Sequence, residues 1–528
     1  MAQSQPGEAQ PEIPPGAGSP ATGGLLGVDV GGSGIRVGFF DPPTLLRLLI
    51  SRPDPGAGEQ FDPDLTWRAV ASAIRELTGR GLPVRAVGLT AHLATVLAGP
   101  DGRPTAPAML WRDNHAWREA AELRARLGPA LEFVTGRPTS AEYAAARMRR
   151  LARTDPRVVG RTRWLLSLKD YLVLRLTGQP GTDPATASYT QLFDVRQRRW
   201  SPRIARECCV PTEILPCVRP GVAPAGGVTP AAAQLTGLAP GTPVAVGGPD
   251  GSTGALGVGA VRAGMTVDIA GTTDVLLHVT DQPAGHAGRG TVLNAYLLAD
   301  LWTMGGPTGL TGGGLEWLAV TLGHASAEAA YLALASAMDA VDPGDLMVRT
   351  TLSGRRMPGW DERLRGRIDG ISWQHGPAHL MRAAEEGSAF EVRLGIDALR
   401  SGGAVVDRVI LAGGPASSPR GPQLRANVWD AQVATVAERH ASLRGAALVA
   451  AVAGGSFTDA QQAAVHMAPR IRSCDPDPAG VAATEHRYRR WRTVMALRTP
   501  GANGRAGKKR PRTRRRCVTP GRVRPLVY

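Results

Sequence analysis

The chain has 528 residues and carries 61 lysines and arginines against 45 acidic residues, which gives a net charge of +16. With 43% hydrophobic and 20% charged residues, it is neither wholly disordered nor collagen-like nor a coiled coil, and its length indicates two or more domains. Ten of the positive charges lie in residues 501–528, which contain no acidic residue, so the first 500 residues carry only +6.

The predicted elements begin after a disordered leader, residues 1–23, with an α/β domain over residues 24–243. An apolar strand at 25–30 runs into a glycine turn, and a second strand at 35–40 follows at hairpin spacing. A buried strand is predicted at 84–89. Helical periodicity is present in four stretches, at 64–77, 116–127, 143–152 and 167–176.

A stretch dense in glycine and proline, residues 220–243, predicts the boundary to a second domain over residues 244–498. This domain repeats the pattern of strand, glycine turn and strand at 265–279, and a further strand meets a glycine pair at 405–414. Helices are predicted at 423–437, 443–453 and 485–497. Residues 499–528 lack periodicity and are predicted to form a basic, disordered tail.

The sequence was searched for membrane-spanning, secretory and metal-binding signals, which indicate the compartment and the partners of a protein. No apolar run approaches the ~20 residues needed to cross a bilayer, and the leader has no apolar core typical of a signal peptide. The five cysteines form no Cys-x-x-Cys pair, so we expect a reduced, cytoplasmic protein without a structural zinc site. The ten basic residues of the tail could neutralise several phosphates of a nucleic acid. With Tyr528 as its one aromatic residue, however, it is interpreted as a solvated, arginine-biased extension, and no nucleic-acid partner is expected.

Three glycine turns that follow strands are candidate phosphate sites, at 29–36, 271–273 and 413–418. A turn without a Cβ atom lets backbone N–H groups approach phosphate oxygens. Each turn alone is a weak signal, because paired glycines punctuate most α/β proteins. The chain has no Walker A lysine motif and no G-x-G-x-x-G opening a helix after its first strand, which argues against a P-loop protein and a dinucleotide-binding fold.

The segment 247–257, with the sequence GGPDGSTGALG, places Asp250 between glycines beside the predicted domain boundary. A carboxylate in that position is placed to touch a ligand in a cleft. Alternatively, Asp250 caps the helix that begins there, as aspartate commonly does. The local pattern favours neither interpretation.

The order of these motifs resembles the FGGY family of carbohydrate kinases, and its xylulose kinases in particular. The resemblance rests on DVGGS at 29–33, WRD at 111–113, the segment 247–257 and GTT at 271–273. It also rests on three longer stretches: the run of KDY, LTG, TD, AS and FD motifs at 168–200, LSGRRMPGWD at 352–361, and a C-terminal signature at 370–387. The similarity extends from about residue 25 to residue 497.

This resemblance implies two ribonuclease-H-like domains of the actin-like ATPase class, an active-site cleft between them, and an ATP-dependent sugar kinase. Asp250 would be the general base, and Asp29 would hold Mg²⁺. The sugar would contact His92, Trp111, Asp113 and Asp250, although packing of Trp111 in the core is an equal alternative. ATP would be bound by the three turns, the last on the adenine and ribose side, through Gly31, Gly32, Ser33, Gly271, Thr272, Thr273, Gly413, Gly414 and Ser417.

Some positions depart from the family pattern. Ala94 stands where xylulose kinases usually have histidine, so His92 either replaces it from two residues earlier or is structural. Gly251 after the aspartate disfavours glycerol as the substrate, which is expected to be a ketose or a related sugar or polyol. The alternative is a catalytically altered sugar- or nucleotide-binding protein on the same fold, and a homodimer is also considered. Further exchanged positions are His115, Arg147 and Arg355.

Overall fold

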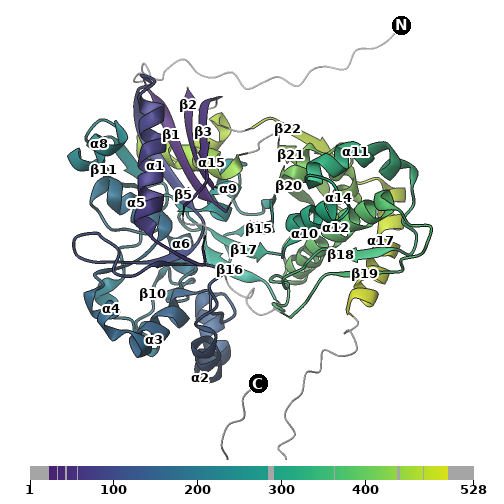
Figure 1. Ribbon diagram of the computed structural model, residues 1–528, viewed down its shortest axis with the longest axis horizontal. Helices are drawn as coiled ribbons and strands as arrows, with labels where there is room; N and C mark the ends of the chain where they lie inside the picture. Colours follow the sequence, from purple (N-terminus) through teal and green to yellow (C-terminus); the bar gives the residue numbers. More distant parts are fainter. Residues whose placement is uncertain are drawn as a thin grey trace, which may run out of the picture.

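The computed structural model describes residues 23–32, 34–41, 45–55, 58–283, 290–361, 363–436, 440–467 and 469–496. It has two lobes, each built around a seven-stranded sheet (Figure 1). The predicted disordered tail, nearly all of the predicted leader, and Ser33 lie outside the described residues. Within the described ranges, no helix is long and apolar enough to cross a membrane.

The first sheet has the strand order β11-β12-β5-β1-β2-β3, with β13 also paired to β5. The predicted hairpin is confirmed as antiparallel β1 and β2, whereas β1, β12 and β13 run parallel to β5. The carboxyl ends of these parallel strands therefore meet at one edge of the sheet. The strands are β1 (Gly24–Gly31), β2 (Gly34–Asp41), β3 (Leu45–Arg52), β5 (Val84–Ala91), β11 (Pro224–Gly227), β12 (Pro243–Ala245) and β13 (Gly248–Pro249).

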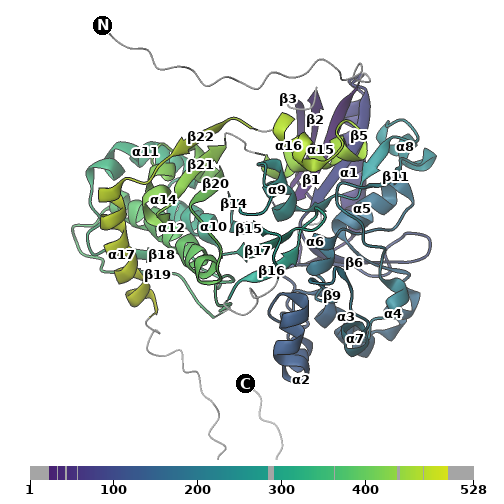
Figure 2. The same cartoon turned by 180° about the vertical axis from the view of Figure 1, so that it is seen from behind.

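Helices cover both faces of this sheet. On one face lie α1 (Pro63–Thr78) and α5 (Leu168–Thr177), whose apolar residues share a core with β1 and β5. On the other lies α15 (Ala441–Ala453), which comes from the far end of the sequence and packs beside α9 (Asp250–Gly257), as Figure 2 shows from behind. The approach of α15 is so close that a Cβ on Gly88 of β5 would lie 1.8 Å from a helix carbonyl oxygen.

Most of the rest of the first lobe lies below the large sheet in Figure 1, and residues 111–115 lie between its strand β7 and its helix α2. Its four-stranded sheet has the order β4-β7-β6-β8. Its strands are β4 (Gln60–Phe61), β6 (Ala94–Ala98), β7 (Ala108–Leu110), β8 (Trp164–Ser167) and the separate pair β9 (Phe193–Asp194) and β10 (Arg199–Trp200). The lobe's other helices are α2 (Trp117–Thr135), α3 (Ala144–Thr154), α4 (Pro156–Arg161), α6 (Pro184–Ser188), α7 (Pro202–Glu207) and α8 (Pro230–Thr236).

The second sheet has the order β16-β17-β15-β14-β20-β21-β22. Its strands β14 and β20 are parallel and place Ala270 opposite Gly413, so the turns that follow them lie at one edge. Gly413 has φ 101°, and a Cβ there would lie 1.9 Å from the Ala270 carbonyl oxygen, so the position requires glycine. The strands are β14 (Thr266–Ala270), β15 (Asp274–Thr280), β16 (Val292–Ala295), β17 (Trp302–Pro307), β20 (Arg408–Gly413), β21 (Gln432–Val436) and β22 (Ile471–Cys474).

Helices around the second sheet complete the lobe, with aromatic residues of α12, α14 and α17 in its core. A short hairpin, β18 (Met347–Arg349) and β19 (Arg367–Asp369), lies at the outside. The helices are α10 (Thr311–Thr321), α11 (Ala327–Ala340), α12 (Pro377–Ser401), α13 (Gly414–Ser417), α14 (Gly421–Trp429) and α17 (Pro478–Ala496). A further helix, α16 (Ala460–His466), packs against α15 beside the first sheet (Figure 2).

Two predictions differ from this architecture. The helix predicted at 423–437 ends at Trp429, because Asp430 takes a left-handed conformation (φ 48°) and the following residues form β21 beside β20. A short apolar run does not by its pattern distinguish a buried strand from a helix. The boundary predicted at 243/244 falls inside the first sheet, since β12 and β13 pair with β5 and the second sheet begins with Thr266.

Candidate active site

Three neighbouring strand ends of the first sheet bring Asp29, His92 and Asp250 together. Asp29 pairs in register with Thr90 of β5, two residues before His92. On the other side of β5, Gly248 pairs with the same Thr90, and Asp250 begins the helix α9 directly after β13. The three side chains are close enough for their charges to interact, since Asp250 raises the pKa of Asp29 and His92 lowers the pKa of both carboxyl groups.

Asp29 is buried and is partly neutralised. Burial, followed by repulsion from Asp250, raises its pKa to about 6, against the opposing effects of Arg36 and His92. Arg36 lies opposite Asp29 in the β1–β2 hairpin and places Nη1 3.2 Å from Oδ2. The other oxygen, Oδ1, is buried and has no hydrogen-bond partner among the described residues. Sequence reasoning overlooked Arg36, although the hairpin register would have placed it opposite Asp29.

Asp250 is the first residue of α9, but it does not cap the helix in the way the alternative interpretation requires. The N-cap position belongs to Pro249, and the Asp250 Oδ1 atom accepts the N–H of the adjacent Gly251 at 2.8 Å. Burial raises the pKa of Asp250, while His92 and the Gly251 N–H act to lower it. A half-buried carboxylate beside a histidine is thus held at the start of the helix.

A buried lysine holds the chain that leads to Asp250. Lys169 Nζ donates to the carbonyl oxygen of Val246 at 3.0 Å and lies 2.5 Å from Asp170 and 3.1 Å from Asp183. Burial acts to lower the pKa of Lys169, but the two carboxylates outweigh it and raise the pKa, so the lysine is charged. The KDY and TD motifs therefore share one structural role, which is to form the ion cluster that holds the chain leading to Asp250. Sequence reasoning did not assign that role, although Lys169 is the one lysine in the first 500 residues.

His92 faces this site from a buried position. Its Nε2 atom lies 3.6 Å from Oδ2 of Asp54, and its backbone N–H donates to the Val30 carbonyl oxygen at 2.8 Å. The Nδ1 atom is buried without a hydrogen-bond partner among the described residues. Within the described ranges, His92 Nδ1 and Asp29 Oδ1 are therefore two buried polar atoms at the same strand ends that are available to a ligand.

The glycine turns of the second sheet lie against α9 and α10. Gly271 and Thr272 are exposed, and the Thr272 carbonyl oxygen accepts the N–H of Gly313 in the first turn of α10 at 2.9 Å. A Cβ on Gly251, next to Asp250, would lie 3.4 Å from Val275, just after this turn. The structure therefore brings Gly271, Thr272 and Thr273 close to the start of α9, and strand pairing brings Gly413 and Gly414 beside them. Ser417 ends α13 and is exposed, and Gly31 and Gly32 end β1 and follow it.

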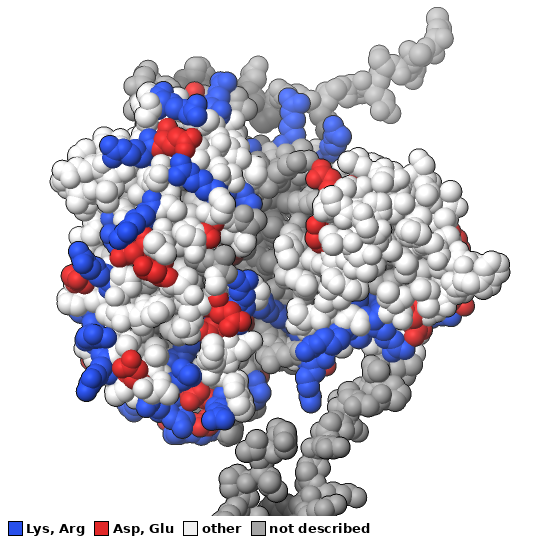
Figure 3. All heavy atoms as spheres, viewed as in Figure 1, with Lys and Arg blue, Asp and Glu red and all other residues white. Residues whose placement is uncertain are grey.

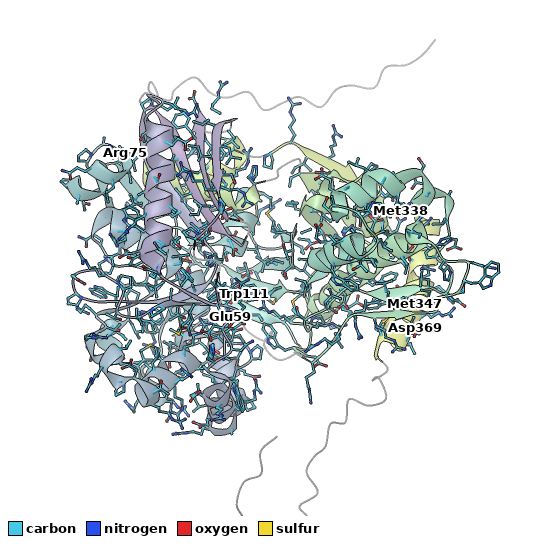
Figure 4. All side chains as sticks on the ribbon, in the orientation of Figure 1. Glu59, Arg75, Trp111, Met338, Met347 and Asp369 are labelled. Atoms are coloured by element: carbon cyan, nitrogen blue, oxygen red, sulfur yellow. The ribbon has the colours of Figure 1, made fainter. Side chains whose placement is uncertain are left out.

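Trp111 is 36% exposed, so the alternative that it packs in the core is wrong. The Arg356 guanidinium lies 4.6 Å from the centre of its ring and 3.3 Å from Glu142. Arg356 comes from the second half of the chain, and Figure 4 shows Trp111 near the middle of the molecule, where the lobes meet. Trp111 is therefore placed at a junction between segments that are distant in sequence.

Asp113 is buried, and its carboxylate is engaged by protein donors. It accepts hydrogen bonds from Gln60 at 2.8 Å and from the backbone and ring of His115 at 2.9 and 2.7 Å. Burial acts to raise the pKa of Asp113, but these hydrogen bonds outweigh it and lower the pKa. Arg147 donates to the Met109 and Asp113 carbonyl oxygens at 2.8 and 3.2 Å. The exchanged residues His115 and Arg147 thus stabilise the loop that carries Trp111.

The comparisons with known proteins agree with this architecture. Residues 25–257 match the N-terminal domain of the FGGY family of carbohydrate kinases, and residues 266–454 match its C-terminal domain. The xylulose kinase of Escherichia coli K12 is 29% identical over 418 residues, which cover 77% of this chain and 85% of that protein. The glycerol kinase of Gloeobacter violaceus is 28% identical over 462 residues, covering 84% and 90%.

A solved structure extends the likeness to three dimensions. The crystal structure of xylulose kinase from Rhodospirillum rubrum superposes with a TM-score of 0.81 at 25% identity, covering 90% of this chain and 98% of that one. The predicted fold class, two ribonuclease-H-like domains of the actin-like type, is confirmed. With both domains matched over most of its length, the chain belongs to the FGGY family of carbohydrate kinases.

Proposed function

We propose that this carbohydrate kinase transfers the γ-phosphate of ATP to a hydroxyl of a ketose or a related polyol, with Asp250 as the general base. The family supplies the reaction class. The observation that carries the finer proposal is the convergence of Asp29, His92 and Asp250 at three strand ends, with the 271–273 turn against the same helix α9.

Asp250 has the properties of a base for this reaction. Phosphoryl transfer leaves a protein mainly with positioning and charge stabilisation to perform, and a base must reach one substrate hydroxyl. Burial raises the pKa of Asp250 above its ordinary value, which makes its carboxylate a better proton acceptor. His92 opposes that rise and so favours the ionised form in which Asp250 can accept a proton.

The residues present fit a magnesium ion at Asp29. Its buried Oδ1 atom has no protein partner in the described ranges, and its repulsion with Asp250 is of the kind that a bound cation relieves. Mg²⁺ takes most of its ligands from water and phosphate oxygens, so a single carboxylate of the chain would be enough to hold it. When bound, Mg²⁺ would neutralise charge on the phosphates of ATP.

The turns then have complementary roles toward ATP. Gly31 and Gly32 would approach the transferred phosphate from the first sheet, and the 271–273 turn would approach it from the second. Gly413, Gly414 and Ser417 would lie on the adenine and ribose side. The predicted phosphate contact of Ser33 falls outside the described residues.

The substrate side is proposed to involve His92 Nδ1 and the exposed face of Trp111. The hydrogen bonds of Asp113 suit a residue that holds the Trp111 loop, so its direct contact with sugar stays a prediction. Relatives named xylulose kinase and glycerol kinase span ketoses and polyols, and a xylulose-like ketose is the leading candidate here.

An assay that couples ADP release to a signal, run across pentuloses, hexuloses, polyols and aldonates, tests this proposal. We expect turnover with at least one ketose, and a loss of about 10²–10⁴-fold in kcat for Asp250→Ala with ATP binding retained. Asp459→Ala, which removes the exposed N-cap of α16, is the matched control and should keep full turnover, because Asp459 contacts none of the proposed site residues that the structure describes. Undiminished sugar-dependent turnover in Asp250→Ala would contradict the assignment of the base. Sugar binding by the wild type without phosphorylation of any compound would favour the non-catalytic alternative.

A further inference from the structure

Arg356 of the second lobe contacts two residues of the first lobe at the same time. Its guanidinium lies 4.6 Å from the centre of the Trp111 ring and places Nη2 3.3 Å from a carboxylate oxygen of Glu142. Glu142 lies 214 residues earlier in the chain, so only the tertiary structure brings the two together. A planar guanidinium that stacks on an indole ring and also bonds a carboxylate is held in one orientation. The contact is therefore specific for arginine.

The backbone of Arg356 is fixed to the second lobe. Its N–H donates to the Thr308 carbonyl oxygen at 3.0 Å, and its own carbonyl oxygen accepts the N–H of Trp360 at 2.7 Å. The preceding Arg355 makes two contacts with the carboxylate of Glu391 on α12, at 2.9 and 3.1 Å. Glu391 is fully buried, so water does not screen this ion pair. Arg356 therefore moves together with the second lobe.

Thr308 connects Arg356 to the glycine turn 271–273. It follows β17 and is fully buried. Its N–H and its Oγ1 both donate to the Asp274 carbonyl oxygen, at 2.9 and 3.2 Å. Asp274 comes directly after the turn that is proposed to approach the transferred phosphate. Three hydrogen bonds thus form a continuous path from this turn to Arg356.

The other end of the path lies at the proposed sugar side. Tyr189 follows α6 in the first lobe, and burial raises the pKa of its hydroxyl. Arg137 opposes this rise, Asp250 and Glu142 add to it, and Arg356 again opposes it. The charges of Asp250, Glu142 and Arg356 therefore act on the same hydroxyl. Arg356 reaches from the second lobe to the surroundings of the proposed base.

We propose that Arg356 is a positioning residue that couples nucleotide binding at the 271–273 turn to the position of Trp111, and thereby to sugar binding. This inference rests on the proposed function, which places ATP at that turn and the sugar at the exposed face of Trp111. A nucleotide that orders the turn also holds Arg356 against Trp111 and Glu142, so the sugar side is ordered before the sugar arrives. The coupling is reciprocal, so a bound sugar strengthens nucleotide binding by the same factor.

The test uses ADP without any sugar, so it does not depend on which sugar is the substrate. Amide hydrogen exchange of the full-length protein is measured with and without ADP. In the wild type, ADP should slow exchange at 271–273 and also around Trp111, where the Trp111 N–H donates to the Leu93 carbonyl oxygen at 3.1 Å. The effect around Trp111 should be about tenfold, which one cation–π contact and one half-exposed ion pair supply together.

Substitutions of Arg356 separate the coupling from nucleotide binding itself. In Arg356→Met, ADP should still slow exchange at 271–273 but should no longer slow it around Trp111. Arg356→Lys keeps a charge for Glu142 but cannot stack a planar group on the indole, so it should restore only part of the effect. Thermal unfolding of each variant shows that it is folded, and the Arg356 side chain is 30% exposed.

Arg393→Met provides the matched control. Arg393 pairs with Asp397 at 2.8 Å and lies 5.4 Å from the centre of the Tyr488 ring, so it makes the same two kinds of contact within the second lobe. This variant should keep the wild-type response of Trp111 to ADP.

Two results would overturn the coupling. One is a wild type in which ADP slows exchange at 271–273 but not around Trp111. The other is a folded Arg356→Met protein in which ADP slows exchange around Trp111 as much as in the wild type. The lack of any effect of ADP at 271–273 is a different result, which would refute the proposed nucleotide site and the coupling with it.

Discussion

Replacing Lys169 by methionine tests whether the buried lysine cluster positions Asp250, the proposed general base. The substitution keeps most of the side-chain volume but removes the charge between Asp170 and Asp183 and the hydrogen bond to the Val246 carbonyl. Lys169 and both aspartates are at most 1% exposed, so water does not screen the two carboxylates that are left unpaired. Removing one partner of such a buried ion pair costs about 3–5 kcal/mol.

This loss should appear in both stability and catalysis. For domains of this size, each kcal/mol lowers the melting temperature by about 2–4 °C, so a decrease on the order of 10 °C is expected. A displacement of about 1 Å at a reacting group costs about 10²-fold in rate, and we expect a fall of that order in kcat. The KM for ATP should change little, because the 271–273 and 413–414 turns belong to the other sheet.

Two further variants separate positioning from general loss of stability. Lys169→Met/Asp183→Asn leaves one buried carboxylate fewer, so it should regain part of the melting temperature but not the kcat. Arg393→Met breaks the 2.8 Å ion pair with Asp397 in the second lobe and should lower stability while leaving kcat unchanged. The assays are differential scanning calorimetry and coupled ADP release with the best sugar. A Lys169→Met enzyme with wild-type kcat and melting temperature would refute the reasoning.

Three further outcomes are expected. The pKa of Asp29 is about 6 in the wild type, where Arg36 acts to lower it. Arg36→Met removes this effect, so the pKa of Asp29 should rise and the acid limb of the kcat/KM profile should shift to higher pH. An unchanged limb would count against Asp29 acting as a carboxylate. The folding stability of the ligand-free protein, unlike its activity, should fall as the pH rises. The raised pKa of Asp29 contributes fully to stability below the unfolded pKa of 3.8, and this contribution is lost as the pH rises through about 6. Gly271→Ala should raise the KM for ATP several-fold at an unchanged melting temperature, because the added Cβ has space. Gly413→Ala should lower the melting temperature, because its Cβ would lie 1.9 Å from a carbonyl oxygen. Equal melting curves for the two variants would contradict this reasoning. Trp111→Ala should raise the KM for sugar more than it lowers the melting temperature, because the ring is 36% exposed and only part of its surface packs against the protein; steady-state kinetics and calorimetry check this, and an unchanged KM for sugar would count against the contact.

Most elements of the first sheet could be predicted, because their signals are local. The strand, glycine turn and strand at 25–40 form a hairpin whose register follows from a short turn, and the structure confirms it. The predicted helices at 64–77 and 167–176 agree with α1 and α5 to within about one residue. By contrast, the strand at 432–436 was predicted as helix, because its strand character comes from pairing with β20, a segment that lies earlier in the chain.

The residues of the candidate site likewise fall into those that the sequence predicts and those that it does not. Asp29 and Asp250 were predicted from motifs of a few residues beside glycines, and their side chains do interact. Arg36, Asp54 and the contact of Arg356 with Trp111 were not predicted, since each depends on a partner brought in by strand register or by packing. The boundary at 243/244 failed for the same reason, because the partner of β12 is β5.

The sequence by itself determined that this is a two-domain α/β kinase of the FGGY type, and it predicted the glycine turns and the aspartate that are proposed to bind phosphate and to serve as the base. These properties can be predicted from short runs of adjacent residues, because the order of apolar residues, glycines and carboxylates is enough to identify the motifs. Only the tertiary structure decided which groups surround Asp250, and that burial raises the pKa of Asp29 and of Asp250. It also decided that the charged side chains crowd the visible face of the first lobe and are few on that of the second (Figure 3). Burial and charge interaction depend on distances in space, and residues far apart in the chain set those distances.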